Sequence, residues 1–228
     1  AGTDVVVHDH HQVGGPLPPA VAIVNPNRED DLSGQGHLFA AGVVFLTLVA
    51  TVRALRAAAP DKAPPDLLGW LDLVALATVC DVVSLTGVNR AFVVKGLLAI
   101  RRQQNPGLGA LIRVSRIGEP VNAFHLAFLI GPRINAGGRI GRADLGVRLL
   151  LEGDISEAAR IAAELDRLNG ERRLIEQAAE AQAEAEALAS LGLEDKGAVI
   201  VTAAEGWHPG VVGLVASRLK LSLIHISE

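Results

Sequence analysis

The 228-residue sequence predicts a helix-rich α/β fold with a parallel sheet, flanking helices, a long helix and the beginning of a second α/β unit. Two short β-branched runs, at residues 5–7 and 21–24, have the character of neighbouring buried strands in a parallel sheet. Most of the remaining chain has helical spacing. The longest such pattern covers residues 154–188, about ten turns, and helices of that length often connect domains.

Helix-start signals place the elements that follow the two strands. The uncharged run at residues 38–52 is too short to cross a bilayer, so it predicts a buried core helix. Asp66 is suited to the N-cap of a helix that ends near Asp81, and Asn89 is suited to opening the next one. These signals predict three consecutive helices after the sheet.

The C-terminal half is bounded by three further signals. The glycine-rich stretch at residues 131–139 predicts a loop or a helix-to-loop transition. Asp154 and Glu157 form a capping-box pattern at the start of the long helix. Residues 198–202 then predict a strand, and residues 210–220 the helix that follows it.

Composition narrows the class of protein. Half of the residues are hydrophobic, so a sizeable core can form, although only 3% are aromatic and none is Met, which suggests a fragment. No signal peptide is recognisable, and the single cysteine, Cys80, indicates a reducing cytoplasm without internal disulfides. The net charge of −4 does not itself indicate a nucleic-acid binder, because local basic patches decide phosphate binding.

Polar residues with metal-binding chemistry follow the first strand. Asp9, His10 and His11 stand where ligands gather in open α/β sheets, and a carboxylate with two imidazoles suits Mn²⁺, Zn²⁺ or Fe²⁺. A solvated polar loop is the alternative. Asp81 ends an apolar helix, where a carboxylate is costly unless it is paired or bound to metal, or simply faces water. Asp72 is interpreted as a surface residue.

A second group of residues is suited to phosphate. Arg133, Asn135 and Arg139 stand among glycines, which allow a phosphate to approach the backbone while arginines grip it. His208 is at the entrance to a helix, ahead of Arg218, and helix N-termini bind anions. Solvated arginines in a turn, and a loop histidine, are the alternatives.

Five segments in order are much more specific than any one of them alone. They are VVVHDHHQVGGPLP, LDLVALATVCDVVSLTGVNR, GPRINAGGRIG, LNGERRLIEQ and GWHPGVVGLVASRLK. Together they resemble the RecJ-type single-strand-specific 5′→3′ exonucleases of the DHH phosphoesterase superfamily, from about residue 5 to residue 220. The resemblance implies hydrolysis of phosphodiesters with two divalent ions, Mn²⁺ or Mg²⁺, that activate the attacking water and stabilise the developing charge.

The resemblance also implies residue roles. His10 and Asp81 match metal ligands, Asp9 supports the metal site, and His11 lies beside the scissile phosphate. In the glycine-rich motif Arg139 matches a phosphate contact, accompanied there by Arg133 and Asn135. His208 and Arg218 belong to the start of the DHH-associated domain.

The domain organisation implied by the resemblance has four parts. Residues 1–152 match a DHH domain that lacks its N-terminal part, 153–192 the connector helix, 193–220 the start of the DHH-associated domain, and 221–228 a non-native tail. The family's two earlier acidic motifs precede the segments matched by this chain. We therefore expect only part of the ligand set, with weak Mn²⁺ binding and no useful turnover from these residues alone.

The resemblance implies a cytoplasmic, monomeric protein that acts on single-stranded DNA in repair and recombination, without a membrane and with helicase or single-strand-binding partners. Two alternatives stay open. One is a DHH-family phosphodiesterase acting on oligoribonucleotides or cyclic dinucleotides. The other is a non-catalytic relative that binds DNA or a partner protein.

Overall fold

The computed structural model describes residues 2–191 and 199–223, which divide into two compact units. The first unit holds the described residues up to 105 together with residues 117–131. The second holds residues 106–116 and the described residues from 132 onward.

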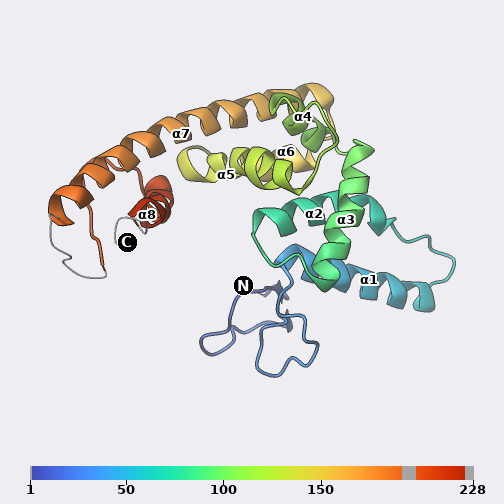
Figure 1. Ribbon diagram of the computed structural model, residues 1–228. Helices are drawn as coiled ribbons and strands as arrows, with labels where there is room; N and C mark the ends of the chain where they lie inside the picture. The colour runs from blue at the N-terminus through green and yellow to red at the C-terminus, as the bar shows by residue number, and fades with distance from the viewer. Residues whose placement is uncertain (1, 192–198, 224–228) are drawn as a thin grey trace. The chain divides into compact units, whose positions relative to one another are not determined.

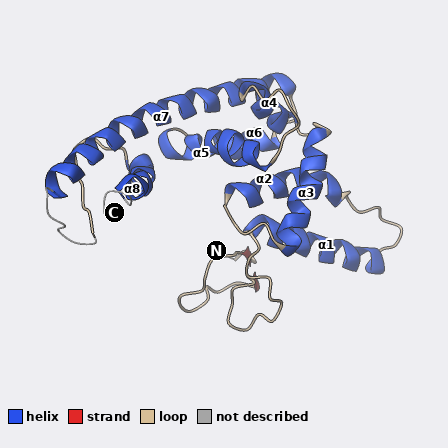
Figure 2. Cartoon of the chain, viewed as in Figure 1, coloured by secondary structure: helices blue, strands red, loops and turns tan. Residues whose placement is uncertain are grey.

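Unit 1 begins with a small sheet and continues as helices (Figure 2). Its strands pair in parallel with Val7 opposite Ile23, which confirms the predicted parallel pair. Val6 is half-exposed rather than buried, because the described part of the chain contributes only two strands to this sheet. The elements are β1 (Val6–His8), β2 (Ala22–Val24), α1 (Ala40–Ala58), the 3₁₀ turn η1 (Leu67–Trp70), α2 (Leu71–Cys80), α3 (Gly87–Arg101) and the π-helical η2 (His125–Ile130).

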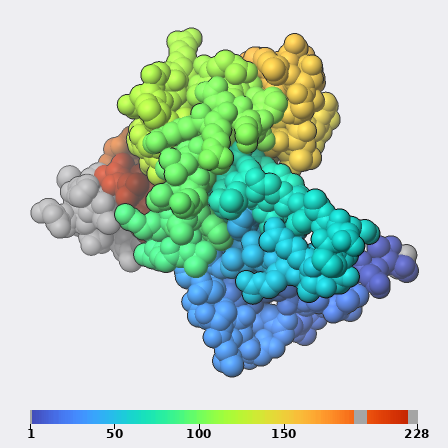
Figure 3. Space-filling model, turned by 90° about the vertical axis from the view of Figure 1, so that its right-hand side faces the viewer, coloured from blue at the N-terminus to red at the C-terminus, as the bar shows by residue number. Residues whose placement is uncertain are grey.

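The core of unit 1 is built by helices α1, α2 and α3. Phe45 of α1 meets Phe92 of α3 edge to face, with ring centroids 5.3 Å apart, and Leu71 and Val74 of α2 complete the cluster. The blue and cyan segments of this unit lie against one another in the space-filling view (Figure 3). By length and composition α1 is apolar enough to cross a membrane. Val43, Phe45 and Val52 of α1 lie in the core cluster, whereas Val44, Leu46 and Val49 are exposed.

The regular elements described in unit 2 are helices, organised along one long helix (Figure 1). Leu165 of that helix is fully buried together with Leu111 and Leu149 from two shorter helices. Farther along the same helix, the small side chains of Ala183 and Ala187 pack against the last helix. The elements are α4 (Pro106–Val114), α5 (Gly131–Ile140), α6 (Leu145–Leu151), α7 (Ile155–Leu191) and α8 (Pro209–Leu223).

Two of the predicted helix starts have the expected hydrogen bonds. The Asp66 carboxylate accepts from the Leu68 backbone N–H at 3.0 Å, as an N-cap does. The Asp154 carboxylate accepts from the Glu157 backbone N–H at 2.8 Å, and α7 then continues without interruption for 37 residues. Local capping chemistry therefore locates both starts correctly.

Three sequence predictions are wrong. Residues 131–139 form most of helix α5, where Gly131 and Gly137 allow close packing and do not make a turn. Asp72 is buried, with 5% of its surface exposed, and burial raises the pKa of its carboxyl. The strand expected at residues 198–202 is not formed over residues 199–202, and residue 198 lies outside the described residues.

Candidate functional site

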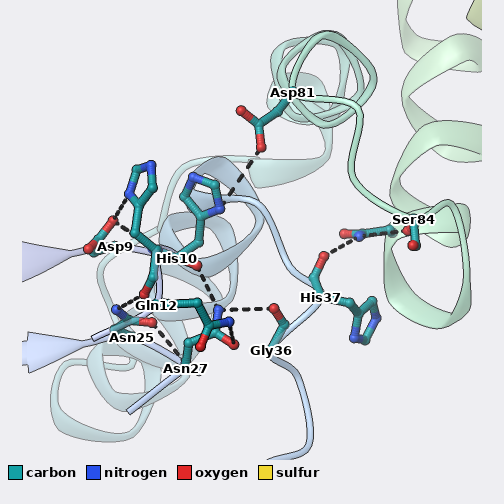
Figure 4. Close-up of polar contacts among 11 residues, drawn as sticks. Asp9, His10, Gln12, Asn25, Asn27, Gly36, His37, Asp81 and Ser84 are labelled. Carbon is teal, nitrogen blue, oxygen red and sulfur yellow. Dashed lines mark hydrogen bonds and ion pairs between the residues drawn. The ribbon is translucent and has the colours of Figure 1, made fainter. Parts of the chain in front are cut away.

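The two predicted metal ligands of unit 1 meet although they come from distant segments (Figure 4). His10 follows β1, and Asp81 caps the C-terminal end of α2. The Nδ1 atom of His10 lies 3.9 Å from Oδ2 of Asp81, and their side chains are 14% and 35% exposed. The ring of Phe39 packs edge-on against the His10 ring at 4.8 Å and limits its movement.

Asp9 acts on the neighbouring histidine. Its Oδ1 accepts hydrogen bonds from Nδ1 of His11 at 2.7 Å and from the His10 backbone N–H at 2.8 Å. The His11 ring, followed by the His10 N–H, lowers the pKa of the Asp9 carboxyl, so Asp9 is ionised at neutral pH. Because an ionised carboxylate only accepts, Nδ1 of His11 donates to it, and in the neutral ring Nε2 carries the lone pair.

The His10–Asp81 pair fits two positions in the coordination sphere of a divalent ion. With bonds of about 2.1 Å to the metal, two donor atoms at a right angle to each other lie about 3.0 Å apart. Two donor atoms on opposite sides of the metal lie about 4.2 Å apart. The observed 3.9 Å lies within this range. Among the residues that the structure describes, no group of three or more His, Cys, Asp or Glu side chains is placed to hold a metal. The described residues therefore bring together two candidate donor atoms, one from His10 and one from Asp81.

Cys80, next to Asp81 in sequence, does not extend the ligand set. Burial, followed by the charge of Asp81, raises the pKa of the Cys80 thiol to about 11. The thiol stays protonated at neutral pH, and metals bind the thiolate.

Two asparagines that follow β2 hold the backbone of the loop that carries His10. The Nδ2 of Asn27 donates to the His10 carbonyl at 2.6 Å and to the Gly36 carbonyl at 3.0 Å. The Nδ2 of Asn25 donates to the His11 carbonyl at 2.9 Å. A local pattern in the sequence does not reveal that these amides reach a distant loop.

A third asparagine was likewise expected only to open a helix. Asn89, in the first turn of α3, is fully buried and donates through Nδ2 to the carbonyls of His37, at 2.7 Å, and Ser84, at 3.0 Å. Ser84 belongs to the loop that follows Asp81, and His37 precedes Phe39. The sequence gives no signal for these two bonds, because both acceptors are backbone carbonyls.

In unit 2 the predicted phosphate-binding residues Arg139 and His208 meet around Gly210. The Nη1 of Arg139 donates to the Gly210 carbonyl at 3.0 Å, while the Gly210 backbone N–H donates to Nδ1 of His208 at 3.1 Å. Because Nδ1 accepts, the neutral His208 ring carries its proton on Nε2, which is suited to donate to an anion. Gly210 is required here, since a Cβ would lie 2.2 Å from the Arg139 carbonyl oxygen.

The other three predicted phosphate-binding residues are not gathered around Gly210. Arg133 pairs with Asp166 of α7 at 2.8 Å. Arg218 of α8 pairs with Glu176 of α7 at 2.7 Å. Asn135 is exposed on α5.

Comparison with known proteins gives consistent relatives. No protein-family model matches the chain. It is 42% identical over 231 residues to the single-stranded-DNA-specific exonuclease RecJ of Salmonella typhimurium and 40% identical to that of Escherichia coli, with 96% of the chain covered in both. The chain spans 39% of the length of both relatives.

Solved structures of RecJ proteins are also similar to this chain. A crystal structure of exonuclease RecJ bound to manganese matches with a TM-score of 0.82 at 37% identity, covering 98% of this chain and 54% of that one. A structure of Thermus thermophilus RecJ in complex with Mn²⁺ matches with a TM-score of 0.79 at 38% identity, covering 97% and 31%. Its Mg²⁺ complex also matches with a TM-score of 0.79, at 35% identity.

Proposed function

The chain belongs to the RecJ family, and on this premise we propose that it forms part of the active site of a single-stranded-DNA-specific 5′→3′ exonuclease. The chain spans about two fifths of the length of curated relatives, so we assign the activity to the protein in its full length. We place that activity in DNA repair and recombination in the cytoplasm.

The convergence of His10 and Asp81 carries the proposal. A histidine nitrogen and a carboxylate oxygen at 3.9 Å, from segments far apart in the sequence, suit a Mn²⁺ or Mg²⁺ site. RecJ structures in complex with these ions support the assignment. Bound divalent ions supply activation of water and stabilisation of negative charge on the reacting phosphate. We assign the remaining ligands to acidic residues elsewhere in the full-length protein.

Neighbouring side chains divide the other tasks. Asp9 keeps the His11 ring oriented with Nδ1 toward the carboxylate, so that Nε2 of a neutral His11 ring can accept a proton or hydrogen bond beside the scissile phosphate. In unit 2, Arg139 and the Nε2–H of His208 bind a backbone phosphate of the DNA strand. We assign a supporting part in phosphate binding to Arg133 and Asn135, through the position of α5, and to Arg218, through the position of α8.

The domain arrangement follows from the same proposal. Residues 1–152 supply the DHH domain, α7 within residues 153–192 connects the domains, and residues 193–220 open the DHH-associated domain. Helicase or single-strand-binding proteins are the partners that we propose, with a monomeric enzyme.

Substitution of Asp81 tests the proposal. In the full-length protein, Asp81→Asn keeps the side-chain shape but removes the charged ligand. Metal assistance is worth several kcal/mol, so we expect degradation of 5′-phosphorylated single strands with Mn²⁺ to fall by about 10²- to 10³-fold. The measurement is release of mononucleotides from a labelled strand, with duplex DNA as the comparison substrate.

Asp30→Asn provides the matched control. Asp30 is an exposed carboxylate of the same unit that pairs with Arg28, so this variant should cleave at the unaltered rate. Equal cleavage by the Asp81 variant and the unaltered protein would disprove the proposed role of Asp81. Preference for di- and trinucleotides over long strands would favour a phosphodiesterase of short oligonucleotides.

A further inference from the structure

We propose that Asn27 and Asn89 are positioning residues that join the segment carrying His10 to the segment carrying Asp81. This inference rests on the proposed function, because it concerns the same metal site. Neither amide touches the two ligand atoms; each acts through backbone carbonyls. Together they fix the separation between the His10 nitrogen and the Asp81 carboxylate.

The first connection runs from His10 to the segment before α1. Asn27 donates both to the His10 carbonyl and to the Gly36 carbonyl, so one amide group joins the two loops. Gln12 donates to the Asn27 Oδ1 at 3.2 Å, which fixes the orientation of the amide. Any side chain at position 36 would disturb the arrangement, since its Cβ would lie 2.5 Å from that oxygen.

The second connection runs from the same segment to the loop after α2. Asn89 donates to the carbonyls of His37 and Ser84. Gly36 and His37 are consecutive, so the two amides hold adjacent peptide groups. The hydrogen-bonded path therefore leads from the His10 carbonyl to Ser84, three residues after Asp81, as Figure 4 shows from His10 to Ser84.

The burial of Asn89 supports a specific role for its two donors. Its side chain is fully buried, and its Oδ1 has no hydrogen-bond partner among the described residues. Burial of an unpaired polar atom is unfavourable, so the residue is not optimal for stability alone. Its two N–H groups provide what an apolar residue of similar size cannot, a bridge between two carbonyls.

The loop that Asn89 holds is strained. Val82, directly after Asp81, has a φ of 61°, which a β-branched residue rarely adopts. Gly87, at the other end of the loop, has a φ of 48°, which glycine adopts without strain. A strained conformation such as that of Val82 persists only where surrounding contacts fix it, and Asn89 binds this loop at Ser84. Loss of that contact should let the backbone beside Asp81 relax.

The experiment compares Mn²⁺ binding in the full-length protein and in its Asn89→Ala and Asn27→Ala variants. The dissociation constant is obtained from the electron paramagnetic resonance signal of free Mn²⁺. Removal of residues that orient metal ligands typically weakens binding by roughly 10- to 100-fold, and we expect a change of that order in each variant. Cleavage should then recover at saturating Mn²⁺, because the ligands themselves remain.

Thr78→Val is the matched control. Thr78 is fully buried in α2 and donates to the Val74 carbonyl at 2.7 Å, so its loss removes a buried hydrogen bond without separating the two segments. Its melting temperature should fall while its Mn²⁺ dissociation constant stays unchanged. Because the two amides act on one path, the double variant should lose less affinity than the product of the single losses.

Unchanged Mn²⁺ affinity in the two asparagine variants would overturn the inference, as would an equal loss of affinity in Thr78→Val. Should Asn89→Ala fail to fold, the partly exposed Asn27 decides the question by itself. Tight Mn²⁺ binding without cleavage of single strands would refute the proposed function instead. The dissociation constants would still test the positioning residues.

Discussion

The close packing of α2 against α3 depends on Gly96, and this gives a prediction whose size can be worked out from distances. A Cβ at Gly96 would lie 2.2 Å from the Leu71 carbonyl oxygen and 2.3 Å from the Ala75 Cβ. Carbon atoms pack best at about 3.5–4.0 Å, so the two helices would have to separate by about 1 Å or more. Overpacking of this kind costs about 1–3 kcal/mol, occasionally more.

Helix propensity acts in the opposite direction. Ala is favoured over Gly by about 1 kcal/mol in a helix interior. Contacts as short as 2.2 and 2.3 Å place the overpacking cost at the upper end of its range, about 3 kcal/mol, so we expect Gly96→Ala to lower the free energy of unfolding by about 2 kcal/mol. Gly170→Ala in α7 is the control: a Cβ there meets no atom within 4 Å, so that variant should be more stable by about 0.5–1 kcal/mol.

Urea unfolding followed by circular dichroism measures both glycine variants. The two substitutions are chemically identical, so a difference in sign isolates the effect of helix packing. Equal stabilisation by both would refute the close approach of α2 and α3. Since α2 ends at Asp81, the Gly96 variant should also bind Mn²⁺ more weakly.

Two further predictions concern charged groups. The pKa of Asp9 is lowered chiefly by His11; its stabilising effect is therefore present above the ordinary value of 3.8 and is lost as the pH falls through the lower folded value. His11→Ala should move the Asp9 pKa upward in an NMR titration, and an unchanged value would refute the pairing. In unit 2, Glu176 is 4% exposed and pairs with Arg172 and Arg218. Arg172→Met should cost about 3 kcal/mol because it breaks a buried pair, and Arg218→Ala should cost less because Arg218 is exposed; equal losses in urea unfolding would contradict this.

Local chemistry was sufficient to predict several elements. A carboxylate two or three residues before the N–H group that it caps is visible in the sequence, and both Asp66 and Asp154 bind as expected. The length of α7 also follows from its spacing of apolar residues. Such interactions join neighbours in the chain, so a single sequence contains the information that determines them.

The glycine-rich stretch shows where local reasoning fails. Gly131 and Gly137 suggest a loop, but both lie in α5, where a Cβ would come 2.6 Å from the Cys80 Sγ and 3.0 Å from the Arg142 carbonyl, respectively. The sequence does not distinguish a glycine needed for backbone flexibility from a glycine needed for close packing. Only the neighbouring atoms distinguish them.

In the candidate metal site, the sequence likewise predicts the residues with ligand chemistry but not the contacts of the residues that position them. His10 was singled out by its place beside Asp9 and His11 after the first strand, and Asp81 as a carboxylate at the end of an apolar helix; the family resemblance then matched both with metal ligands. Asn89 was predicted only as a helix start, which is a frequent place for asparagine and conceals its bonds to His37 and Ser84. A metal ligand can be identified from the chemistry of its side chain, whereas a positioning residue is identified only from the segments that it connects in the structure. Because its partners are backbone carbonyls, which every residue possesses, the amide that connects them leaves no pattern in the sequence.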